Sequence, residues 1–306
     1  KTRMSKGGAR PLHGWLVLDK PLGMSSAQAV GRVRRLTGAA KAGHGGTLDP
    51  LATGVLPIAL GEATKTVAFA MAGRKTYRFT VRWGEARATD DAEGEVVGRS
   101  DVRPDRAAIE AVLPRFTGRV VQVPPRFSAL KVAGRRAYAL ARADSAVELA
   151  PREVEIAALR LLDIPDPDHA EFLAEVGKGT YIRALARDLA AALGTCGPVA
   201  ALRRTAVGRF AEDRAIGLDK LEEIGHGPAL FTHLLPIETA LDDIPALALS
   251  EAEAVRLRQG QAIALGSSGE RVLTQGEMVC ATSGGRPVAL AEVRGERLRP
   301  VRVLNL

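Results

Sequence analysis

Short apolar segments of two different periodicities alternate along this chain, and this alternation restricts the folds that it can adopt. Residues 76–83 place Tyr77, Phe79 and Val81 at every second position, a pattern typical of a strand with one polar face. Residues 180–193 instead carry apolar side chains at helical spacing, at Ile182, Leu185, Ala186, Leu189 and Leu193. The sequence therefore predicts a fold that combines strands with amphipathic helices.

Turn residues divide the rest of the chain into further segments of both kinds. Strands are predicted at 14–20, 54–60, 76–83, 120–123, 153–163 and 170–176. Helices are predicted from Ser25 or Ser26 to about Leu36, and over 62–72, 105–117, 131–143 and 180–193. Gly194 is the expected terminator of the last helix, and residues 84–100 are acidic and turn-like.

The order of these segments predicts three parts. Residues 1–10 are a basic, glycine-containing arm that we expect to be flexible, and they lack the apolar segment of a signal peptide. Residues 11–240 hold the larger domain, and the proline-bounded stretch 236–245 marks a boundary. Residues 246–306 hold a short helix and several short strands between glycines. A module of this size is marginal as an independent fold, so we expect it to pack on the larger domain.

Composition narrows the classes of function. Of the 306 residues, 46% are hydrophobic and 4% aromatic, which allows a core built mainly of Ala, Val, Leu and Ile. The formal net charge of +8 fits a polyanionic partner, and it fits equally a soluble protein that is merely basic. Two distant cysteines and five histidines without ligand spacing predict no disulfide framework and no metal. No run of about 18 apolar residues occurs, so no membrane span is expected.

The segment from His44 to Pro50 (HGGTLDP) is the most unusual, because glycines and a proline surround the carboxylate of Asp49. Glycines let another backbone approach closely, so this carboxylate could be a nucleophile or a base. The alternative is an Asp that only caps the next turn or helix, and the segment taken alone favours this cap. His44 alone gives no sign of a metal ligand.

A second dense segment, KGTYIR at 178–183, begins the predicted helix. Its Lys-Gly-Thr could be a phosphate-binding turn, although it lacks P-loop spacing. Arg183 stands in the first helical turn, where a cation opposes the helix dipole, so it is either a functional residue or an ordinary surface Arg. Residues 124–131 (PPRFSALK) are a rigid turn or an RNA-gripping loop, and Tyr77 is a core aromatic or a base-stacking platform.

Six segments resemble, in this order, the bacterial tRNA pseudouridine-55 synthase family (TruB-type) over nearly the whole chain. They are GWLVLDKPLGMSS at 14–26, GHGGTLDPLATGVLPIALGEATK at 43–65, KTYRF at 75–79, QVPPRFSALKVAGRRAYALAR at 122–142, KGTYIRALARDLAAALG at 178–194 and ALRRTAVGRF at 201–210. The closing LRPVRV at 298–303 resembles the end of the family's small RNA-binding PUA module. Because the segments match in order and spacing, the resemblance favours catalysis over capping for Asp49.

The resemblance implies an α/β fold of the α+β kind, the pseudouridine synthase fold, in which helices flank a central and mainly antiparallel sheet. The catalytic domain would span residues 11–240, with an RNA-gripping loop at about 124–152, and a PUA-like RNA-binding domain would span 246–306. The implied reaction turns uridine into pseudouridine at position 55, in the T loop of tRNA, by base flipping. The glycosidic bond breaks and the base is rejoined through C5, so no cofactor is implied.

Site residues carry over from the resemblance one position at a time. Asp49 matches the family's catalytic Asp, Arg183 the Arg that pairs with it, and Tyr77 the active-site Tyr. His44 matches a His that packs into the T loop. The other implied substrate-binding residues are Tyr181, Leu202, Lys20, Gly46, Thr47, Arg126, Lys131 and Lys178. Basic stretches at 32–35, 126–142 and 203–204 would grip phosphates, with a contribution that weakens in salt.

This chain departs from the family pattern at a few positions. Gly45 stands where Thr is common, Phe127 where Tyr is common, and Val176-Gly177 where Cys-Ser is common. The acidic segment 89–94 is shorter than usual. Each catalytic position is retained, so these departures concern contacts near the site and leave the implied reaction intact.

Other functions stay open beside the implied one. The chain could be a tRNA-binding folding factor that acts without catalysis, or a guide-RNA-dependent pseudouridine synthase. A hydrolase using Asp49 is disfavoured, because no second carboxylate or metal site accompanies it. The expected partner is the T arm of tRNA, with no membrane and no obligatory protein partner, and we expect a monomer in the cytoplasm.

Overall fold

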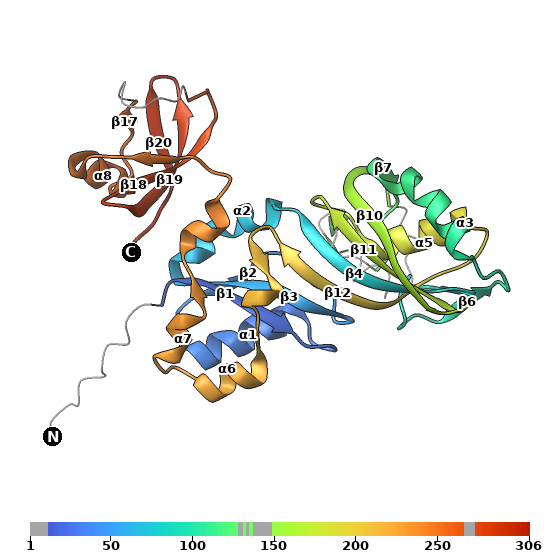
Figure 1. The fold of residues 1–306 in the computed structure, drawn as a ribbon. Helices are drawn as coiled ribbons and strands as arrows, with labels where there is room; N and C mark the ends of the chain where they lie inside the picture. The colour runs from blue at the N-terminus through green and yellow to red at the C-terminus, as the bar shows by residue number, and fades with distance from the viewer. Residues whose placement is uncertain (1–11, 128–130, 133–134, 137–148, 266–272) are drawn as a thin grey trace.

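A long, mainly antiparallel sheet forms the body of the molecule in this computed structural model. The structure describes residues 12–127, 131–132, 135–136, 149–265 and 273–306. The large sheet has 11 strands, and a second sheet of five strands lies near the C-terminus. Figure 1 shows the large sheet along the long axis of the molecule and the small sheet beside one of its ends. The predicted α/β fold with a central, mainly antiparallel sheet is therefore confirmed.

The main strands of the large sheet follow the order β14-β1-β3-β12-β4-β11-β10-β7. Their bounds are β1 Gly14–Lys20, β3 Ala52–Leu60, β4 Lys75–Arg82, β7 Gly118–Gln122, β10 Arg152–Asp166, β11 His169–Val176, β12 Val199–Val207 and β14 Ile216–Gly217. Three short strands pair beside them: β2 Ala42–His44 on β3, β13 Phe210–Ala211 on β12 and β15 Leu234–Leu235 on β1. Parallel pairing occurs between β3 and β12 and between β1 and β14.

Strand β12 is the centre of this sheet, because it joins the two halves. On one side it pairs with β3 in parallel, and on the other side it pairs with β4 in antiparallel register. Leu202 faces Ala52 of β3 and Phe79 of β4 across these two ladders. Three segments that are distant in sequence therefore meet here: the segment after Asp49, the strand that carries Tyr77 and the strand that carries Leu202.

Helices cover the two ends of the large sheet (Figure 1). The α-helices of this body are α1 Ser26–Thr37, α2 Val67–Ala72, α3 Arg106–Val112, α5 Ile182–Ala192, α6 Leu218–Ile224 and α7 Ala229–Thr232. The 3-10 turns are η1 Gly61–Thr66, η2 Leu113–Phe116, η3 Glu212–Arg214 and η4 Ile237–Leu241. Ser25 and Gln28 form a capping box that starts α1, which confirms Ser25 as the N-cap.

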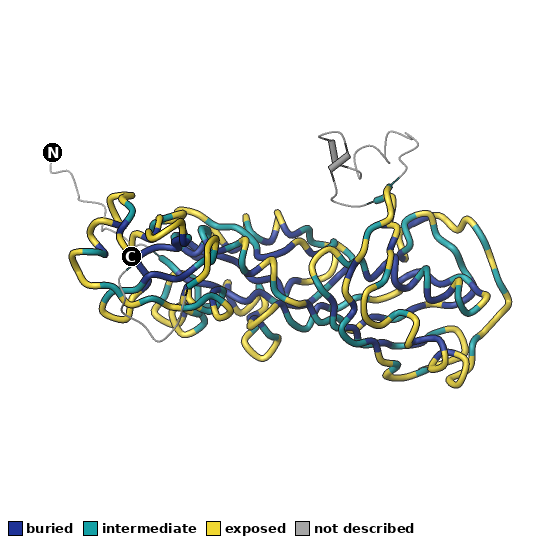
Figure 2. Tube along the Cα trace, turned by 90° about the horizontal axis from the view of Figure 1, so that it is seen from above, coloured by how far each residue is buried: buried dark blue, intermediate teal, exposed yellow. Residues whose placement is uncertain are grey.

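Two hydrophobic clusters fix the helices to the sheet. One packs α5 and α3 on β4 and β11 around Phe79, Phe172 and Trp83, with the rings of Phe79 and Phe172 stacked at 5.3 Å. The other packs α1 on β1 and β3 around Leu18, Leu56 and other aliphatic side chains. Figure 2 shows the buried strands running through the middle of the elongated body, with exposed segments around them. A second buried aromatic pair, Trp15 and Phe210, lies in another cluster with ring centroids 4.9 Å apart.

The C-terminal residues form a separate five-stranded sheet with one helix. Its strands are β16 Ala246–Ala248, β17 Ile263–Ala264, β18 Met278–Ser283, β19 Arg286–Arg294 and β20 Arg297–Val303, and its helix is α8 Glu251–Arg258. Leu304 is buried among Trp15, Val17 and other residues of the large body, and the Lys65 ammonium donates to the carbonyl of Val303 at 2.7 Å. The expected packing on the larger body is confirmed, whereas the domain limits stay a prediction.

The structure corrects three of the predicted elements. The predicted helix over 131–143 begins instead as two short paired strands, β8 Lys131–Val132 and β9 Arg135–Arg136, and residues 137–148 lie outside the described part. Gly134 between these strands favours a turn over a continuous helix. The turn-like stretch 84–100 contains a hairpin of β5 Glu85–Arg87 and β6 Val96–Arg99. The first half of the helix predicted over 62–72 is the 3-10 turn η1.

Candidate functional site

The loop between β2 and β3 presents Asp49 at the centre of the large sheet. Leu48 is anchored to α1, because its N–H donates to the Ser26 hydroxyl and its carbonyl accepts from that hydroxyl, at 2.8 and 2.9 Å. On the other side of Asp49, the Pro50 carbonyl accepts from the N–H of Gly23 at 2.8 Å. The backbone on both sides of Asp49 is therefore fixed, while 43% of its side chain remains exposed.

Arg183 holds the Asp49 carboxylate from the first turn of α5. Its Nη2 lies 2.9 Å from Asp49 Oδ2, and only 7% of the Arg183 side chain is exposed. The same guanidinium reaches Asp91 Oδ2 at 3.3 Å and donates to the carbonyls of Thr89 and Phe127 at 3.1 and 2.9 Å. A planar guanidinium with several fixed acceptors is itself immobile, so it can orient the one carboxylate that faces the pocket. Three of these four acceptors, Thr89, Asp91 and Phe127, lie in segments where this chain departs from the family pattern.

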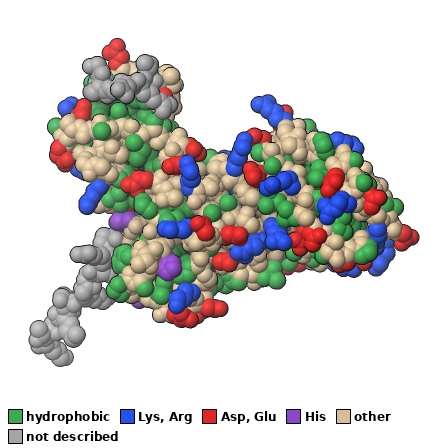
Figure 3. Space-filling view, viewed as in Figure 1, with side chains coloured by type: hydrophobic (Ala, Val, Ile, Leu, Met, Phe, Trp, Pro, Cys, Tyr) green, Lys and Arg blue, Asp and Glu red, His purple; other side chains and the backbone are tan. Residues whose placement is uncertain are grey.

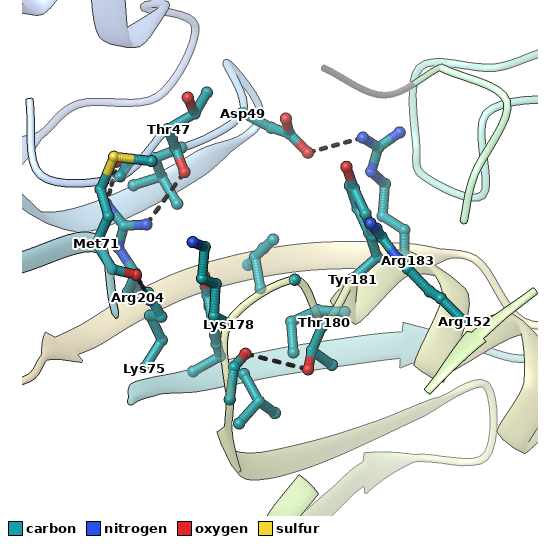
Figure 4. Close-up of a pocket in the computed structure, with 18 residues that line it drawn as sticks. Thr47, Asp49, Met71, Lys75, Arg152, Lys178, Thr180, Tyr181, Arg183 and Arg204 are labelled. Carbon is teal, nitrogen blue, oxygen red and sulfur yellow. Dashed lines mark hydrogen bonds and ion pairs between the residues drawn. The ribbon is translucent and has the colours of Figure 1, made fainter. Parts of the chain in front are cut away.

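A pocket of about 370 Å³ opens beside this ion pair. It is lined by Gly46, Thr47, Leu48, Asp49, Met71, Lys75, Tyr77, Arg152, Val176, Gly177, Lys178, Gly179, Thr180, Tyr181, Ile182, Arg183, Leu202 and Arg204. Figure 4 shows Asp49 reaching toward Arg183, with Tyr181, Arg183 and Arg152 on one side and Lys75, Lys178 and Arg204 on the other. Its volume and its mixture of apolar, aromatic and charged walls suit a small polar ring such as a nucleobase with its sugar.

The pocket is strongly cationic. Its charged lining residues are Lys75, Arg152, Lys178, Arg183 and Arg204, against the single carboxylate of Asp49. Lys178 extends into the pocket from the loop between β11 and α5 (Figure 4). On the face of the molecule drawn in Figure 3, Lys and Arg side chains are spread along the body beside acidic ones. The excess of positive charge inside the pocket therefore favours an anionic ligand such as a nucleotide within RNA.

Arg204 is buried behind the pocket wall, and it binds backbone instead of phosphate. Its guanidinium donates to the carbonyls of Val55, Thr47 and Gly46 at 2.8, 3.1 and 3.0 Å. The prediction that 203–204 grip phosphates is wrong for Arg204, because its donors bind two carbonyls of the Asp49 loop and one carbonyl of β3. The parallel pairing also brings the Arg204 backbone against Gly54, where a Cβ would lie 2.2 Å from the Arg204 carbonyl oxygen. Arg203 pairs with Asp19 and Glu212.

Lys20 has a structural role that differs from the expected one. Its side chain is fully buried outside the pocket, and its ammonium donates to the carbonyls of Pro21, Met24 and Pro50. Burial lowers the pKa of Lys20 from 10.5 to about 8; nearby Asp49 opposes this shift and Arg204 adds to it. The prediction of direct substrate binding by Lys20 is therefore replaced by support of the turn beside the Asp49 loop.

The other predicted residues divide between the pocket and its surroundings. The pocket includes Gly46, Thr47, Asp49, Tyr77, Lys178, Tyr181, Arg183 and Leu202. His44 lies on β2 outside the lining, with its Nδ1 buried and without a hydrogen-bond partner in the described structure. Burial first, and Arg204 second, hold the pKa of His44 below its usual value. Arg126 is exposed outside the pocket lining, and the side chain of Lys131 lies outside what the structure describes.

Sequence reasoning missed Lys75 and Arg152 as pocket residues. Lys75 stands two residues before Tyr77 on the same strand, and this spacing puts both side chains on one face, so the signal was present. Burial lowers the pKa of Lys75 to about 8, with Arg204 and Lys178 contributing in the same direction. Arg152 begins a strand whose alternation gives no hint of a pocket, so only the tertiary structure could identify it.

The described residues also bear on metal binding and on membrane crossing. Within the described ranges, no group of three His, Cys, Asp or Glu side chains is arranged to hold a metal ion. Among the helices of that same part of the chain, none combines the length and the apolar character needed to cross a membrane.

Comparison with known proteins gives two family matches and many close relatives. The model described as "TruB family pseudouridylate synthase (N terminal domain)" matches residues 34–182, and "tRNA pseudouridylate synthase B C-terminal domain" matches residues 183–242. A Bradyrhizobium diazoefficiens protein named tRNA pseudouridine synthase B is 58% identical over 97% of this chain and 87% of its own length. A Rhodospirillum rubrum protein of the same name is 55% identical over 100% of both chains.

Two solved structures with the same fold are chains of larger complexes. A chain of an archaeal box H/ACA Nop10-Cbf5 complex aligns with a TM-score of 0.74 at 24% identity, covering 95% of this chain and 86% of that one. A chain of a Cbf5-Nop10-Gar1 complex aligns with the same TM-score of 0.74 at 25% identity, covering 95% and 85%. At 24% identity, the likeness to the chain of the Nop10-Cbf5 complex supports only the fold assignment.

Proposed function

The chain belongs to the TruB family of pseudouridylate synthases, and we propose that it isomerises uridine to pseudouridine at position 55, in the T loop of tRNA, with Asp49 as the catalytic group. The observation that carries the proposal is the ion pair between Asp49 and the nearly buried Arg183, at the edge of a cationic pocket of nucleoside size. The close relatives are named as tRNA enzymes, so we propose that the chain acts without a guide RNA.

The proposed reaction is an internal rearrangement of the bound nucleotide. The bond from C1′ to N1 breaks, the uracil turns within the pocket, and a bond from C1′ to C5 forms. The proton on C5 is lost and N1 gains a proton, so nothing is oxidised or added and the chemistry requires no cofactor. The Asp49 carboxylate acts at the ribose, either by attacking C1′ or by removing a proton from C2′. In both routes Arg183 keeps the carboxylate aimed.

The aromatic and apolar walls would hold the base while it turns. Tyr77 on β4 and Leu202 on β12 are joined through the β12–β4 ladder and both line the pocket. We assign Tyr77 to stacking on the uracil and to assisting removal of the C5 proton, with Tyr181 and Leu202 enclosing the ring. His44, which is outside the pocket lining, would pack against the T loop and help to keep the nucleotide extruded.

The surrounding cations would bind the RNA backbone. Lys178, Gly46 and Thr47 line the pocket, and we assign them to a phosphate or ribose next to the flipped base. Arg126 and Lys131 are assigned to the proposed RNA-gripping loop. The five-stranded C-terminal sheet is proposed to act as a PUA-like RNA-binding domain, and Arg297, Arg299 and Arg302 of β20 are exposed. Each lost phosphate contact should lower the salt dependence of tRNA binding by about one ion.

The first experiment is release of tritium from an unmodified tRNA transcript labelled at C5 of uridine. The purified chain alone, without added metal or cofactor, is expected to release tritium, and Asp49→Asn is expected to release none while its Kd for tRNA stays within about tenfold. A transcript with cytidine at position 55 should give no release above background. Release by Asp49→Asn would remove Asp49 from the mechanism, and tight binding without release by wild type would favour a folding factor.

Assembly and location are part of the same proposal. We expect the active species to be a monomer in the cytoplasm, without guide RNA or an obligatory protein partner. Light scattering on the preparation used for the tritium assay gives the mass of the active species. Activity that appears only after a guide RNA or a partner protein is added would overturn this part of the proposal.

A further inference from the structure

Tyr181 occupies a position where the local structure gives it little support. It is the N-cap residue of α5, and its side chain makes no capping hydrogen bond. Ser, Thr, Asp and Asn are the favoured residues at such a position, so a Tyr here breaks a local rule. The residue two positions earlier, Gly179, has φ +90°, which adds a flexible point just before it. Something else must therefore fix the Tyr181 ring in the pocket.

The side chain of Gln122 fixes the backbone of Tyr181. Its Oε1 accepts from the N–H of Tyr181 at 3.1 Å, and its Nε2 donates to the Tyr181 carbonyl at 3.4 Å. Gln122 is buried, so these hydrogen bonds are shielded from water. Gln122 is the last residue of β7, and it stands directly opposite Arg152, the first residue of β10. The end of one strand ladder thus presents two side chains to Tyr181.

The guanidinium of Arg152 fixes the ring of Tyr181. Its Cζ lies 4.8 Å from the ring centroid, within the range of a cation–π contact. Two of its nitrogens, Nε and Nη2, are buried from solvent and have no hydrogen-bond partner in the described structure. Leaving buried donors of a charged group unpaired is costly, so the contact with the ring is what favours this conformation. Because solvent cannot reach these two nitrogens, an incoming phosphate cannot reach them without displacing the side chain.

We propose that Arg152 and Gln122 are positioning residues that hold Tyr181 against the base, and that Arg152 acts through the Tyr181 ring instead of binding an RNA phosphate. The inference rests on the proposed function, because it concerns the rate of the same isomerisation. Neither residue touches the reacting atoms. Both stand where the chain leaves β7 and returns at β10, so the segment 123–151 begins and ends at this support.

The test compares Arg152→Met, which keeps the length of the side chain without its charge, with Arg152→Lys and with Arg160→Met. Arg160 is an exposed arginine of the same strand outside the pocket, so Arg160→Met is the matched control. Arg152→Met is expected to lower the single-turnover rate at saturating tRNA about tenfold, with Kd for tRNA within about twofold. Arg152→Lys should recover part of the rate, and Arg160→Met should match wild type.

A double-mutant cycle with Tyr181→Leu decides whether Arg152 acts through the ring. If it does, Arg152→Met combined with Tyr181→Leu is no slower than Tyr181→Leu alone, because the ring to be positioned is already gone. Rate losses that multiply would overturn the proposal. So would an unchanged rate in Arg152→Met, or a weakened Kd with a smaller salt slope, which marks a phosphate contact. An inactive wild type would instead refute the proposed function itself, so the two failures are distinguishable.

Discussion

The two sides of the pocket each contain a buried arginine, and the two arginines differ in what they bind. Arg183 is surrounded by acceptors that include two carboxylates, and one of them, Asp49, faces the pocket. Arg204 donates to three backbone carbonyls, two of which belong to the loop that carries Asp49. One guanidinium therefore aims a reactive group, and the other shapes the backbone that presents it.

Charge and burial alone therefore do not identify a catalytic contact. A guanidinium bound to carbonyls satisfies polar backbone groups that would otherwise be buried without partners, so its loss should unfold the loop. A guanidinium bound to a half-exposed carboxylate fixes a direction, so its loss should leave a folded protein with a misaimed group. Measurements on the two arginines can therefore separate activity from stability.

The largest effect is expected for Arg183→Met. Product formed per molecule of folded protein should fall about a hundredfold or more, because the Asp49 carboxylate loses the donor that orients it. The measurement is the single-turnover rate at saturating tRNA, at a temperature well below the unfolding transition. Arg183→Lys keeps the charge but lacks the planar fork, so it should recover only part of the rate. A nearly normal rate in Arg183→Met would contradict the conclusion that Arg183 orients Asp49 for catalysis.

Arg204→Met should affect stability more than chemistry. The free energy of unfolding is expected to fall by about 2–4 kcal/mol, because three backbone carbonyls lose their donors and two of these hydrogen bonds are buried. Urea denaturation gives this quantity, and the rate per folded molecule at low temperature should stay within about tenfold of wild type. Arg203→Met, at the neighbouring and more exposed position, is the control. A hundredfold lower rate without loss of stability would instead mean that Arg204, like Arg183, orients the catalytic group.

Asp91→Asn tests whether the second carboxylate of Arg183 supports the first. Asp91 is buried and lies 3.3 Å from Arg183 Nη1, so its amide analogue should leave the guanidinium less firmly held. We expect about a tenfold lower rate with little change in tRNA binding. Asp188→Asn removes a comparable carboxylate, paired with Arg187 outside the pocket, and should be close to wild type. Equal rates for both variants would mean that Asp91 does not contribute to holding the Arg183 guanidinium in its catalytic position.

The smallest effect concerns Lys20, beneath the turn beside Asp49. Its pKa is about 8 in the folded protein against 10.5 as the ordinary value, so the folded state releases this proton first as pH rises. The stability of wild type relative to Lys20→Met should therefore be flat below pH 8 and rise between pH 8 and 10.5. Urea midpoints of both proteins across this range provide the measurement. A difference that falls with pH would contradict burial as the cause.

Many elements of the fold could be predicted from local patterns, but the central strand β12 was not among them. Periodicity located α1, β4 and α5, whose apolar residues repeat along the buried face. Strand β1, which is buried on both faces, was located as a short apolar segment before a turn. The helix predicted from Lys131 was wrong, since basic side chains between small apolar ones suit a short hairpin as well as a helix. The 3-10 geometry of η1 depends on packing that no spacing reveals.

From its amino-acid sequence the chain could be assigned to a family, and Asp49 could be matched with Arg183, because six segments resemble that family in order and spacing. The composition around Asp49, taken alone, favoured a cap. Only the tertiary structure decided which cations serve the pocket. Arg204, Lys20 and Arg152 look alike in sequence, yet one holds a loop, one holds a turn and one lies on an aromatic ring. The partner of a long flexible cation depends on which strands the sheet brings together, and strand order is set by long-range packing that local sequence does not encode.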